Sequence, residues 1–164
     1  MSRIYFVGQA PSRETDGQPP FVGKAGKFLA EELMGITQEQ MLRDHDFVNV
    51  LDRWPGKGIN GDLFPLAKAR IAARGLTENL RDRVVILLGN NVARAFGCDK
   101  FEYFRWYEVR HPDNNNVVIA KRCAIIPHPS GVNRLWNLKN NRIVARKFLM
   151  SAVIMASQNT LPAS

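Results

Sequence analysis

Short apolar runs alternate along the chain with segments that have helical periodicity. The run 84–88, Val-Val-Ile-Leu-Leu, has no polar position, which is typical of a strand covered on both faces in a parallel sheet. Buried strands are expected at 3–8, 47–51, 84–88 and 123–126. The spacing of apolar residues predicts helices at 23–34, 63–74, 90–96 and 134–156, and a further short helix that begins at Thr77.

This alternation predicts a three-layer α/β/α sandwich with a mostly parallel central sheet. Strands at 105–110 and 117–121 flank the turn-rich segment HPDNNN and are expected to pair as a hairpin. We expect a single domain over residues 1–156, followed by a flexible tail at 157–164. Ligands of such sheets bind at the carboxyl ends of the strands, so the loops after the first, second and last strands should converge on one site.

The charge of the chain is uneven. Among the 164 residues, 23 are Lys or Arg and 15 are Asp or Glu, which gives a formal net charge of +8. Every acidic residue lies at or before Asp113, whereas seven basic residues follow it. A positive field of this kind favours a polyanionic partner, with nucleic acid as the commonest candidate. The alternative is a basic helix that is simply solvated.

Several classes of protein do not fit the sequence. No apolar run approaches the roughly 20 residues of a membrane span, and the apolar stretch near the N-terminus is too short for a signal peptide. Cys98 and Cys123 are the only cysteines, and their spacing matches no metal-binding pattern. We therefore expect no metal or cofactor, and a monomer located in the cytoplasm or with the nucleoid, without a membrane partner.

Three ordered motifs lie at the expected strand ends. They read GQAPS…PPFVGKAG after the first strand, FVNVL at the second and HPSG after the last. Together they resemble the uracil-DNA glycosylase superfamily, most of all its family-four type, whose first motif is similar to GEAPG…PFVGRAG and whose last motif begins HPS. The resemblance extends from Ile4 to about Asn137. It implies a monofunctional DNA N-glycosylase of base-excision repair, which hydrolyses the bond to uracil or a modified pyrimidine flipped out of DNA.

The resemblance also assigns catalytic roles. His128 matches the residue that donates to the pyrimidine O2 and stabilises the departing base anion. Taken alone, it reads as a loop histidine that caps a turn. Gln9 matches the position that positions or activates water. No lysine occupies a position that the resemblance assigns to catalysis, so a Schiff-base lyase is not expected.

Base binding is assigned to the same strand ends. Phe21 matches the aromatic residue that stacks on the flipped base, although a lone Phe is usually part of a core. Asn49 matches the residue that reads the base edge, because an amide supplies both a donor and an acceptor; it also fits a buried structural Asn. Ala10 occupies the place where other branches of the superfamily carry Asp or Asn.

DNA contacts are expected mainly from the last motif. Val132 lies where relatives place an apolar wedge that fills the hole left by the flipped base. The residues placed to contact phosphates are Ser12, Ser130, Asn133 and Arg134.

Two departures from family four bear on mechanism. The glutamate of its first motif is Gln9 here, and an amide orients water but does not accept its proton. Three outcomes stay open: a slow enzyme, a carboxylate supplied by Asp16 or, less well placed, Glu14, or a non-catalytic DNA-binding module on the same fold. The cysteines that ligate the family-four iron–sulfur cluster are absent, so packing has to replace the cluster.

The substrate is also left open. In the commonest uracil enzymes a bulky Tyr blocks the thymine methyl group, and Ser12 holds the matching place here. A small residue leaves room at C5, so a 5-substituted pyrimidine is compatible with the sequence. A small-molecule hydrolase that uses the same pocket is a third interpretation, which the basic C-terminal third disfavours.

Overall fold

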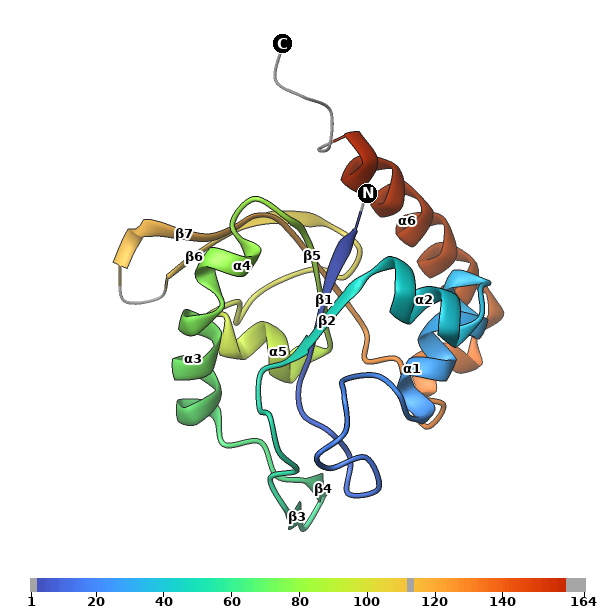
Figure 1. The fold of residues 1–164 in the computed structure, drawn as a ribbon, viewed down its shortest axis with the longest axis horizontal. Helices are drawn as coiled ribbons and strands as arrows, with labels where there is room; N and C mark the ends of the chain where they lie inside the picture. The colour runs from blue at the N-terminus through green and yellow to red at the C-terminus, as the bar shows by residue number, and fades with distance from the viewer. Residues whose placement is uncertain (1–2, 112–113, 159–164) are drawn as a thin grey trace.

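The computed structural model describes residues 3–111 and 114–158, and its centre is a five-stranded sheet (Figure 1). The strand order is β2-β1-β5-β7-β6; the first four strands run parallel and β6 runs antiparallel to β7. The strands are β1 (Ile4–Gly8), β2 (Asp46–Asn49), β5 (Val84–Leu88), β6 (Trp106–His111) and β7 (Asn114–Ile126), with a separate hairpin of β3 (Lys57–Gly58) and β4 (Gly61–Asp62).

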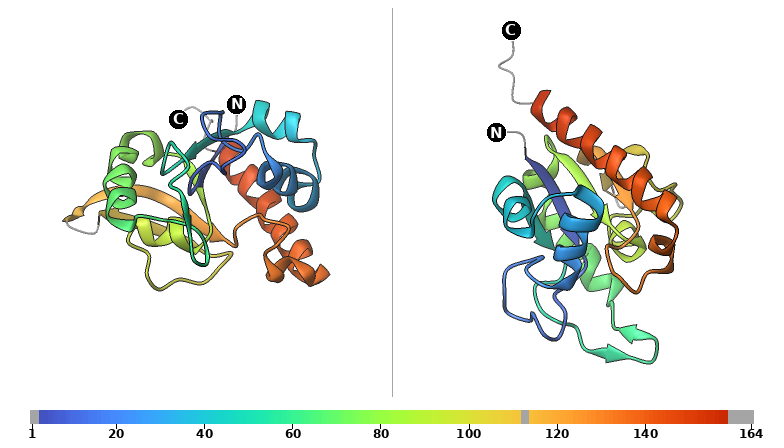
Figure 2. Two further views of the ribbon diagram at one scale, coloured as in Figure 1. Left: turned by 90° about the horizontal axis from the view of Figure 1, so that it is seen from below. Right: turned by 90° about the vertical axis from the view of Figure 1, so that its right-hand side faces the viewer.

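Helices cover both faces of this sheet (Figure 2). One face is covered by α1 (Lys24–Phe28), the π-helical segment η1 (Leu29–Met34), α2 (Gln38–Asp44) and the long α6 (Lys139–Gln158). The other face is covered by α3 (Leu66–Gly75), α4 (Thr77–Leu80) and α5 (Asn90–Ala95). The expected three-layer sandwich with a mostly parallel sheet is therefore confirmed.

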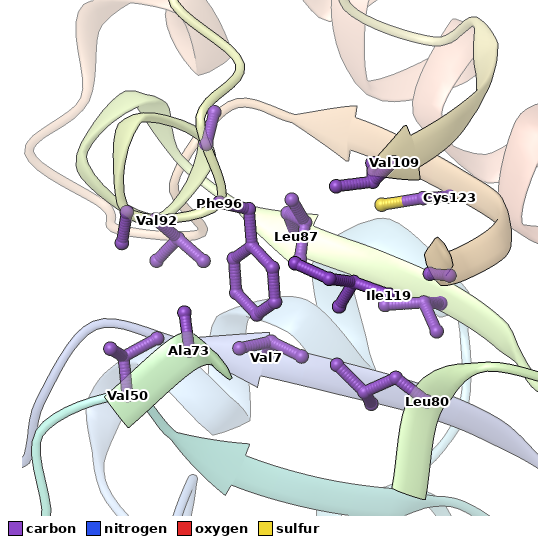
Figure 3. Packing of buried hydrophobic residues seen from close by; sticks show 14 of the residues in the cluster. Val7, Val50, Ala73, Leu80, Leu87, Val92, Phe96, Val109, Ile119 and Cys123 are labelled. Carbon is purple, nitrogen blue, oxygen red and sulfur yellow. The ribbon is translucent and has the colours of Figure 1, made fainter. Parts of the chain in front are cut away.

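Each face of the sheet carries a hydrophobic cluster, the first on the α5 side and the second on the α6 side. Together they explain why β5 has no polar position. Its residues alternate between the faces, so Leu87 packs with Phe96 of the α5 side while Ile86 packs with Phe6 and Trp136 on the α6 side. Figure 3 shows the first cluster, in which Leu87 and Phe96 lie close together. A central parallel strand covered on both faces requires apolar residues at each position.

The helix α2 was not predicted from the sequence. Its N-terminus is held by a capping box: the Gln40 backbone N–H donates to Thr37 Oγ1 at 3.1 Å, and the Thr37 N–H donates back to Gln40 Oε1 at 3.1 Å. The T-x-x-Q pattern was present in the sequence, but the helix has only seven residues and buries only Met41.

Three parts of the predicted secondary structure need correction. Strands expected at 117–121 and 123–126 are one strand, β7, because Arg122 pairs with Val84 at the start of β5 and continues the ladder. The helix expected at 134–156 begins with a 3-10 turn, η2 (Arg134–Asn137), before α6. The loop after β2 contains the β3–β4 hairpin, which no apolar alternation announced.

Two expectations fall partly outside the described residues. The turn expected at HPDNNN includes residues 112–113, and the expected tail includes residues 159–164, all of which lie outside the described residues. Residues 157–158, which the sequence assigned to that tail, still belong to α6. Over the described ranges, no helix is both long enough and apolar enough to cross a membrane.

Candidate functional site

The expected motifs meet at one edge of the sheet. Gly8 ends β1, Asn49 ends β2, Gly89 follows β5, and His128 lies two residues beyond β7. These four strands are parallel neighbours, so their carboxyl ends form a row. With about 4.8 Å between adjacent strands, the row from β2 to β7 is about 14 Å wide. His128 and Asn49 therefore lie at the same edge of the sheet.

Gly8 is the floor on which two candidate side chains meet. A Cβ atom at this position would lie 2.5 Å from Asn49 Oδ1 and 2.5 Å from Phe21 Cζ. Both distances are shorter than real carbon contacts, so only glycine permits this arrangement. The Asn49 amide and the Phe21 ring thus lie side by side over the end of β1.

The backbone of Phe21 is held in an unusual conformation. Its φ is +62°, which is strained for an aromatic residue. Gln38 Nε2 donates to the Phe21 carbonyl at 2.7 Å and to the Gly23 carbonyl at 3.0 Å. A Cβ on Gly26 would lie 1.8 Å from the Phe21 carbonyl oxygen, so the second glycine of VGKAG is required. The unpredicted helix α2 therefore positions Phe21 through Gln38.

The Phe21 ring also belongs to the core. Its centroid lies 5.5 Å from that of Phe47, which stacks on Phe6 at 5.1 Å with the two rings 9° from parallel. The two interpretations of Phe21 are therefore compatible, because one edge of the ring packs on the core while the ring lies against Gly8.

His128 lies at the far end of the row. Its Cβ is 3.2 Å from the position that a Cβ on Gly89 would occupy, so the histidine packs directly on the end of β5. Burial lowers the pKa of His128 below its usual value, which leaves a neutral imidazole at pH 7. Within the described ranges the imidazole makes no hydrogen bond. A neutral ring with a free N–H is a suitable donor to an oxygen anion.

The carbonyl of His128 is the centre of the last loop. It accepts hydrogen bonds from the Ser130 backbone N–H at 2.9 Å, from Asn133 Nδ2 at 3.2 Å and from Trp136 Nε1 at 2.9 Å. Trp136 is 2% exposed and packs 6.1 Å from Phe28. The sequence motifs assign no role to Trp136, whereas in the structure its indole N–H holds the backbone carbonyl of His128.

Gln9 has a partner that sequence reasoning missed. Asn91 Nδ2, at the start of α5, lies 3.4 Å from Gln9 Oε1. The Gln9 carbonyl accepts from the Leu51 N–H at 2.9 Å, which ties the segment after β1 to that after β2. Ala10 packs against the core cluster on the α5 side. The signal for Asn91 was its position, since Gly89-Asn90-Asn91 follows a fourth strand at the same edge.

Asp16 is bound by another loop. Its carboxylate accepts from Arg53 Nε at 2.8 Å, from an Arg53 terminal nitrogen at 3.0 Å and from the Trp54 backbone N–H at 2.9 Å. The hydrogen bonds from Arg53 are the main reason that the pKa of Asp16 is lowered to about 2. Asp16 therefore joins loop 9–22 to the loop after β2. Glu14, in the same loop, is exposed.

The expected DNA-contacting residues lie mostly on the surface. Ser12 is exposed, and its hydroxyl lies 2.9 Å from Thr15 Oγ1 within a local turn. Val132 is 89% exposed, and its N–H donates to Ser130 Oγ at 3.3 Å. Arg134 is exposed at the start of η2.

Asn133 differs from these residues because its side chain serves the loop. Its amide oxygen accepts from the Leu135 N–H at 3.1 Å and its amide nitrogen donates to the His128 carbonyl. A groove beside this loop is lined by Lys24 and Phe28 of α1 and by Ser130 and Val132.

No group of three or more His, Cys, Asp or Glu side chains with metal-binding geometry occurs in the described part of the chain. Burial raises the pKa of Cys98 to about 11 and that of Cys123 well above its usual value. Both thiols are therefore protonated at neutral pH and are poor ligands in that form.

Comparison with known proteins agrees with this geometry. A family model described as the uracil DNA glycosylase superfamily matches residues 1–148, which include all the strand-end motifs. The chain belongs to the uracil DNA glycosylase superfamily. A search of curated proteins finds no match. Members of the superfamily are DNA glycosylases, hydrolases that act on DNA, so the expected class of enzyme and of partner is supported at that level.

Proposed function

We propose that this protein hydrolyses the N-glycosidic bond of uracil, or of a 5-substituted pyrimidine, that has been flipped out of DNA. One observation carries the proposal: Phe21 and Asn49 meet over Gly8 at the same sheet edge as a neutral His128. A stacking ring, an amide and an anion-stabilising donor are the groups that pyrimidine excision needs.

The departing base is the first chemical problem. Cleavage of the bond leaves negative charge on the pyrimidine, shared with O2, while the sugar acquires oxocarbenium character. His128 donates its N–H to O2 as this charge develops. A neutral imidazole suits this role because it needs no counterion in a partly buried site. Three hydrogen bonds to the backbone carbonyl of His128 hold the residue in place.

Recognition of the base falls to Asn49 and Phe21. The Asn49 amide pairs with N3 and O4 of the pyrimidine, while the ring of Phe21 stacks on its face. Ser12 holds the place where a bulky residue would block C5 of the pyrimidine, and its small side chain leaves space there. A substituent at C5 is therefore accommodated, which makes 5-substituted pyrimidines part of the proposed substrate class.

Water is positioned by amides. Gln9 and its partner Asn91 together offer donors and acceptors beside the base-binding site. Asp16 was the sequence-based candidate for a general base, but its oxygens are bonded to Arg53 and Trp54. We therefore assign Asp16 to loop positioning and the water to Gln9.

The DNA itself is held by the loop after β7. Val132 fills the space left by the flipped nucleotide, and Ser130 and Arg134 contact flanking phosphates, with Ser12 on the opposite loop. Asn133 acts through the loop backbone. We place this function in a monomeric single domain, in the cytoplasm or with the nucleoid.

The test is base release from a panel of duplex and single-stranded oligonucleotides. Each carries one uracil, thymine or 5-substituted uracil, and alkali-labile sites report excision. We expect cleavage at uracil or a 5-substituted pyrimidine and none at purines. Absence of cleavage at every base, with the protein shown to be folded, would rule out the enzymatic function.

A non-catalytic base-binding module is the second candidate, and Gln9 is the observation that favours it, because no carboxylate lies at the water position. The variant Gln9→Glu separates the candidates. In a slow enzyme, a general base at this position accelerates cleavage, with about 10²-fold as the lower end of the usual gain. In a binding module, neither the parent nor the variant releases a base.

A further inference from the structure

The β3–β4 hairpin is the part of the site's surroundings that the proposed function leaves unused. Lys57 pairs with Asp62 and Gly58 with Gly61, and the Leu63 N–H closes the hairpin on the Gly56 carbonyl at 2.8 Å. Figure 1 shows the hairpin at the same end of the molecule as loop 9–22 and the carboxyl ends of β1 and β2. In Figure 2 it projects beyond the helices.

The turn of this hairpin consists of Ile59 and Asn60. Ile59 is 100% exposed, and Val132, the expected wedge, is 89% exposed. The other exposed large hydrophobic residues among those described are 39–68% exposed. Single exposed apolar residues are common on protein surfaces. Here, however, the two most exposed large hydrophobic side chains of the described residues are both in loops that follow strand ends of the same site.

The hairpin is fixed relative to that site. Arg53 and the Trp54 N–H bind Asp16 of loop 9–22, and the Leu51 N–H binds the Gln9 carbonyl at 2.9 Å. Leu63 packs beneath the hairpin, 2.9 Å from where a Cβ on Gly58 would lie. Ile59 therefore lies on a hairpin whose base is held by hydrogen bonds and packing, and an inserting side chain needs such a rigid base.

Charge does not explain the hairpin. Lys57 lies opposite Asp62 in the ladder, and Arg53 is paired with Asp16. Apart from these charged residues, the hairpin presents the polar side chain of Asn60 and the aliphatic side chain of Ile59 at its turn. Aliphatic side chains between base pairs are a known means of unstacking DNA, because the bend they cause brings more protein surface into contact.

We propose that Ile59 is a second apolar wedge, which enters duplex DNA near the nucleotide that Val132 displaces. This inference rests on the proposed function in one respect, that the protein binds DNA with a nucleotide flipped out. It adds a partner surface, duplex DNA on the β3–β4 hairpin, and it implies that duplex is bound more tightly than single strands.

The experiment measures binding rather than cleavage. The probe is a duplex with one tetrahydrofuran abasic-site analogue and a 2-aminopurine next to it, on its 5′ or its 3′ side. Insertion of a side chain unstacks 2-aminopurine and raises its fluorescence. The variants are Ile59→Ala and the matched control Ile71→Ala, since Ile71 on α3 is also exposed, at 68%.

We expect Ile59→Ala to weaken duplex binding about tenfold, the loss for one well-buried aliphatic side chain. It should also reduce the fluorescence rise on one side of the analogue, while Val132→Ala reduces it on the other. Affinity for single strands and the salt dependence of binding should not change, because no phosphate contact is removed. Ile71→Ala should match the parent protein.

Four results would overturn this inference. They are equal binding by Ile59→Ala and Ile71→Ala, an equal loss on single strands, no duplex binding by the parent protein, and a change of oligomeric state in Ile59→Ala by light scattering. The proposed function fails separately: base release without an Ile59 effect removes only the wedge. An Ile59 effect without base release removes only the catalysis.

Discussion

Substitution of Gly8 by alanine tests the centre of the proposed site. The added Cβ would lie 2.5 Å from Asn49 Oδ1, 2.5 Å from Phe21 Cζ and 2.6 Å from Phe21 Cε2. Ordinary contact begins at 3.4 Å, so both side chains have to move by about 1 Å. The strand itself has little freedom, because the Gly8 carbonyl accepts from the Val50 N–H at 2.9 Å.

The size of the effect follows from that displacement. A shift of about 1 Å in a group that positions substrate costs about 10²-fold in rate, which corresponds to about 2.7 kcal/mol of transition-state stabilisation. Overpacking a buried position also destabilises a fold by about 1–3 kcal/mol. We therefore expect Gly8→Ala to lower kcat/KM about 10²-fold while the protein remains folded.

The assay is single-turnover base release, with thermal unfolding measured in parallel. Gly75→Ala is the control, because a Cβ at Gly75 meets nothing within 4 Å. It should leave cleavage unchanged and stabilise the fold by up to about 1 kcal/mol, the gain expected for Gly to Ala in a helix. If Gly8→Ala cleaves at the parental rate, the contact of Phe21 and Asn49 over Gly8 has no bearing on function.

Four further predictions address three residues, His128, Arg134 and Asp16. His128→Ala should lower cleavage by about 10²–10³, the loss for one oxyanion donor, with DNA affinity nearly unchanged in a gel-shift assay. Arg134→Ala should weaken binding to all DNA sequences and reduce the slope of log affinity against log salt by about one. Asp16→Asn should raise KM more than it lowers kcat, since it loosens a loop rather than removes a base. The Asp16–Arg53 contact should hold above about pH 4 and be lost as pH falls toward 2, which tryptophan fluorescence can follow because Asp16 also binds Trp54.

Each of these has a contrary result. Equal cleavage by His128→Ala and the parent protein would remove His128 from the mechanism, and an unchanged salt slope would mean that Arg134 touches no phosphate. Loss of kcat alone in Asp16→Asn, with KM unchanged, would return Asp16 to the role of general base. A fluorescence transition centred near pH 4 would show that Arg53 does not hold the carboxylate.

The strands of the site could be predicted because their patterns are local. The five residues of β5 are apolar throughout, and the structure buries every one of them. Gln9 and His128 follow strands and Asn49 ends one, so their shared edge could be inferred from the general rule for parallel sheets. Helix α2 was not predicted, although the T-x-x-Q pattern of its capping box is present in the sequence, because the helix has too few apolar residues to show helical periodicity.

The contacts that organise the site could not be predicted in the same way. Gln9 meets Asn91 only because β1 and β5 are adjacent, and order along the chain does not give adjacency in a sheet. The bond from Asp16 to Arg53 depends on the conformations of two irregular loops. Residue type alone made Asp16 a candidate general base, whereas its hydrogen bonds to Arg53 and Trp54 lower its pKa and occupy its oxygens.

The low pKa of Asp16 affects which substrates should be cleaved fastest. A carboxylate whose pKa is about 2 accepts protons poorly at neutral pH, and the amides of Gln9 and Asn91 do not accept them. In the proposed mechanism no strong proton acceptor activates the attacking water. The rate of cleavage therefore depends mainly on how readily the pyrimidine departs as an anion stabilised by His128. Electron-withdrawing groups at C5 stabilise the departing anion, and a methyl group does the reverse.

We therefore expect cleavage to be faster for 5-fluorouracil than for uracil, and slower for thymine than for uracil, when single-turnover rates are compared in one duplex sequence. Gln9→Glu should reduce the differences in rate among these substrates, because a carboxylate that activates water makes cleavage depend less on the stability of the departing pyrimidine anion. A size series separates electronic from steric effects: 5-chloro and 5-methyl groups are similar in size but opposite in electronic effect. Equal rates for that pair would mean that space near Ser12, and not departure of the base, sets the preference.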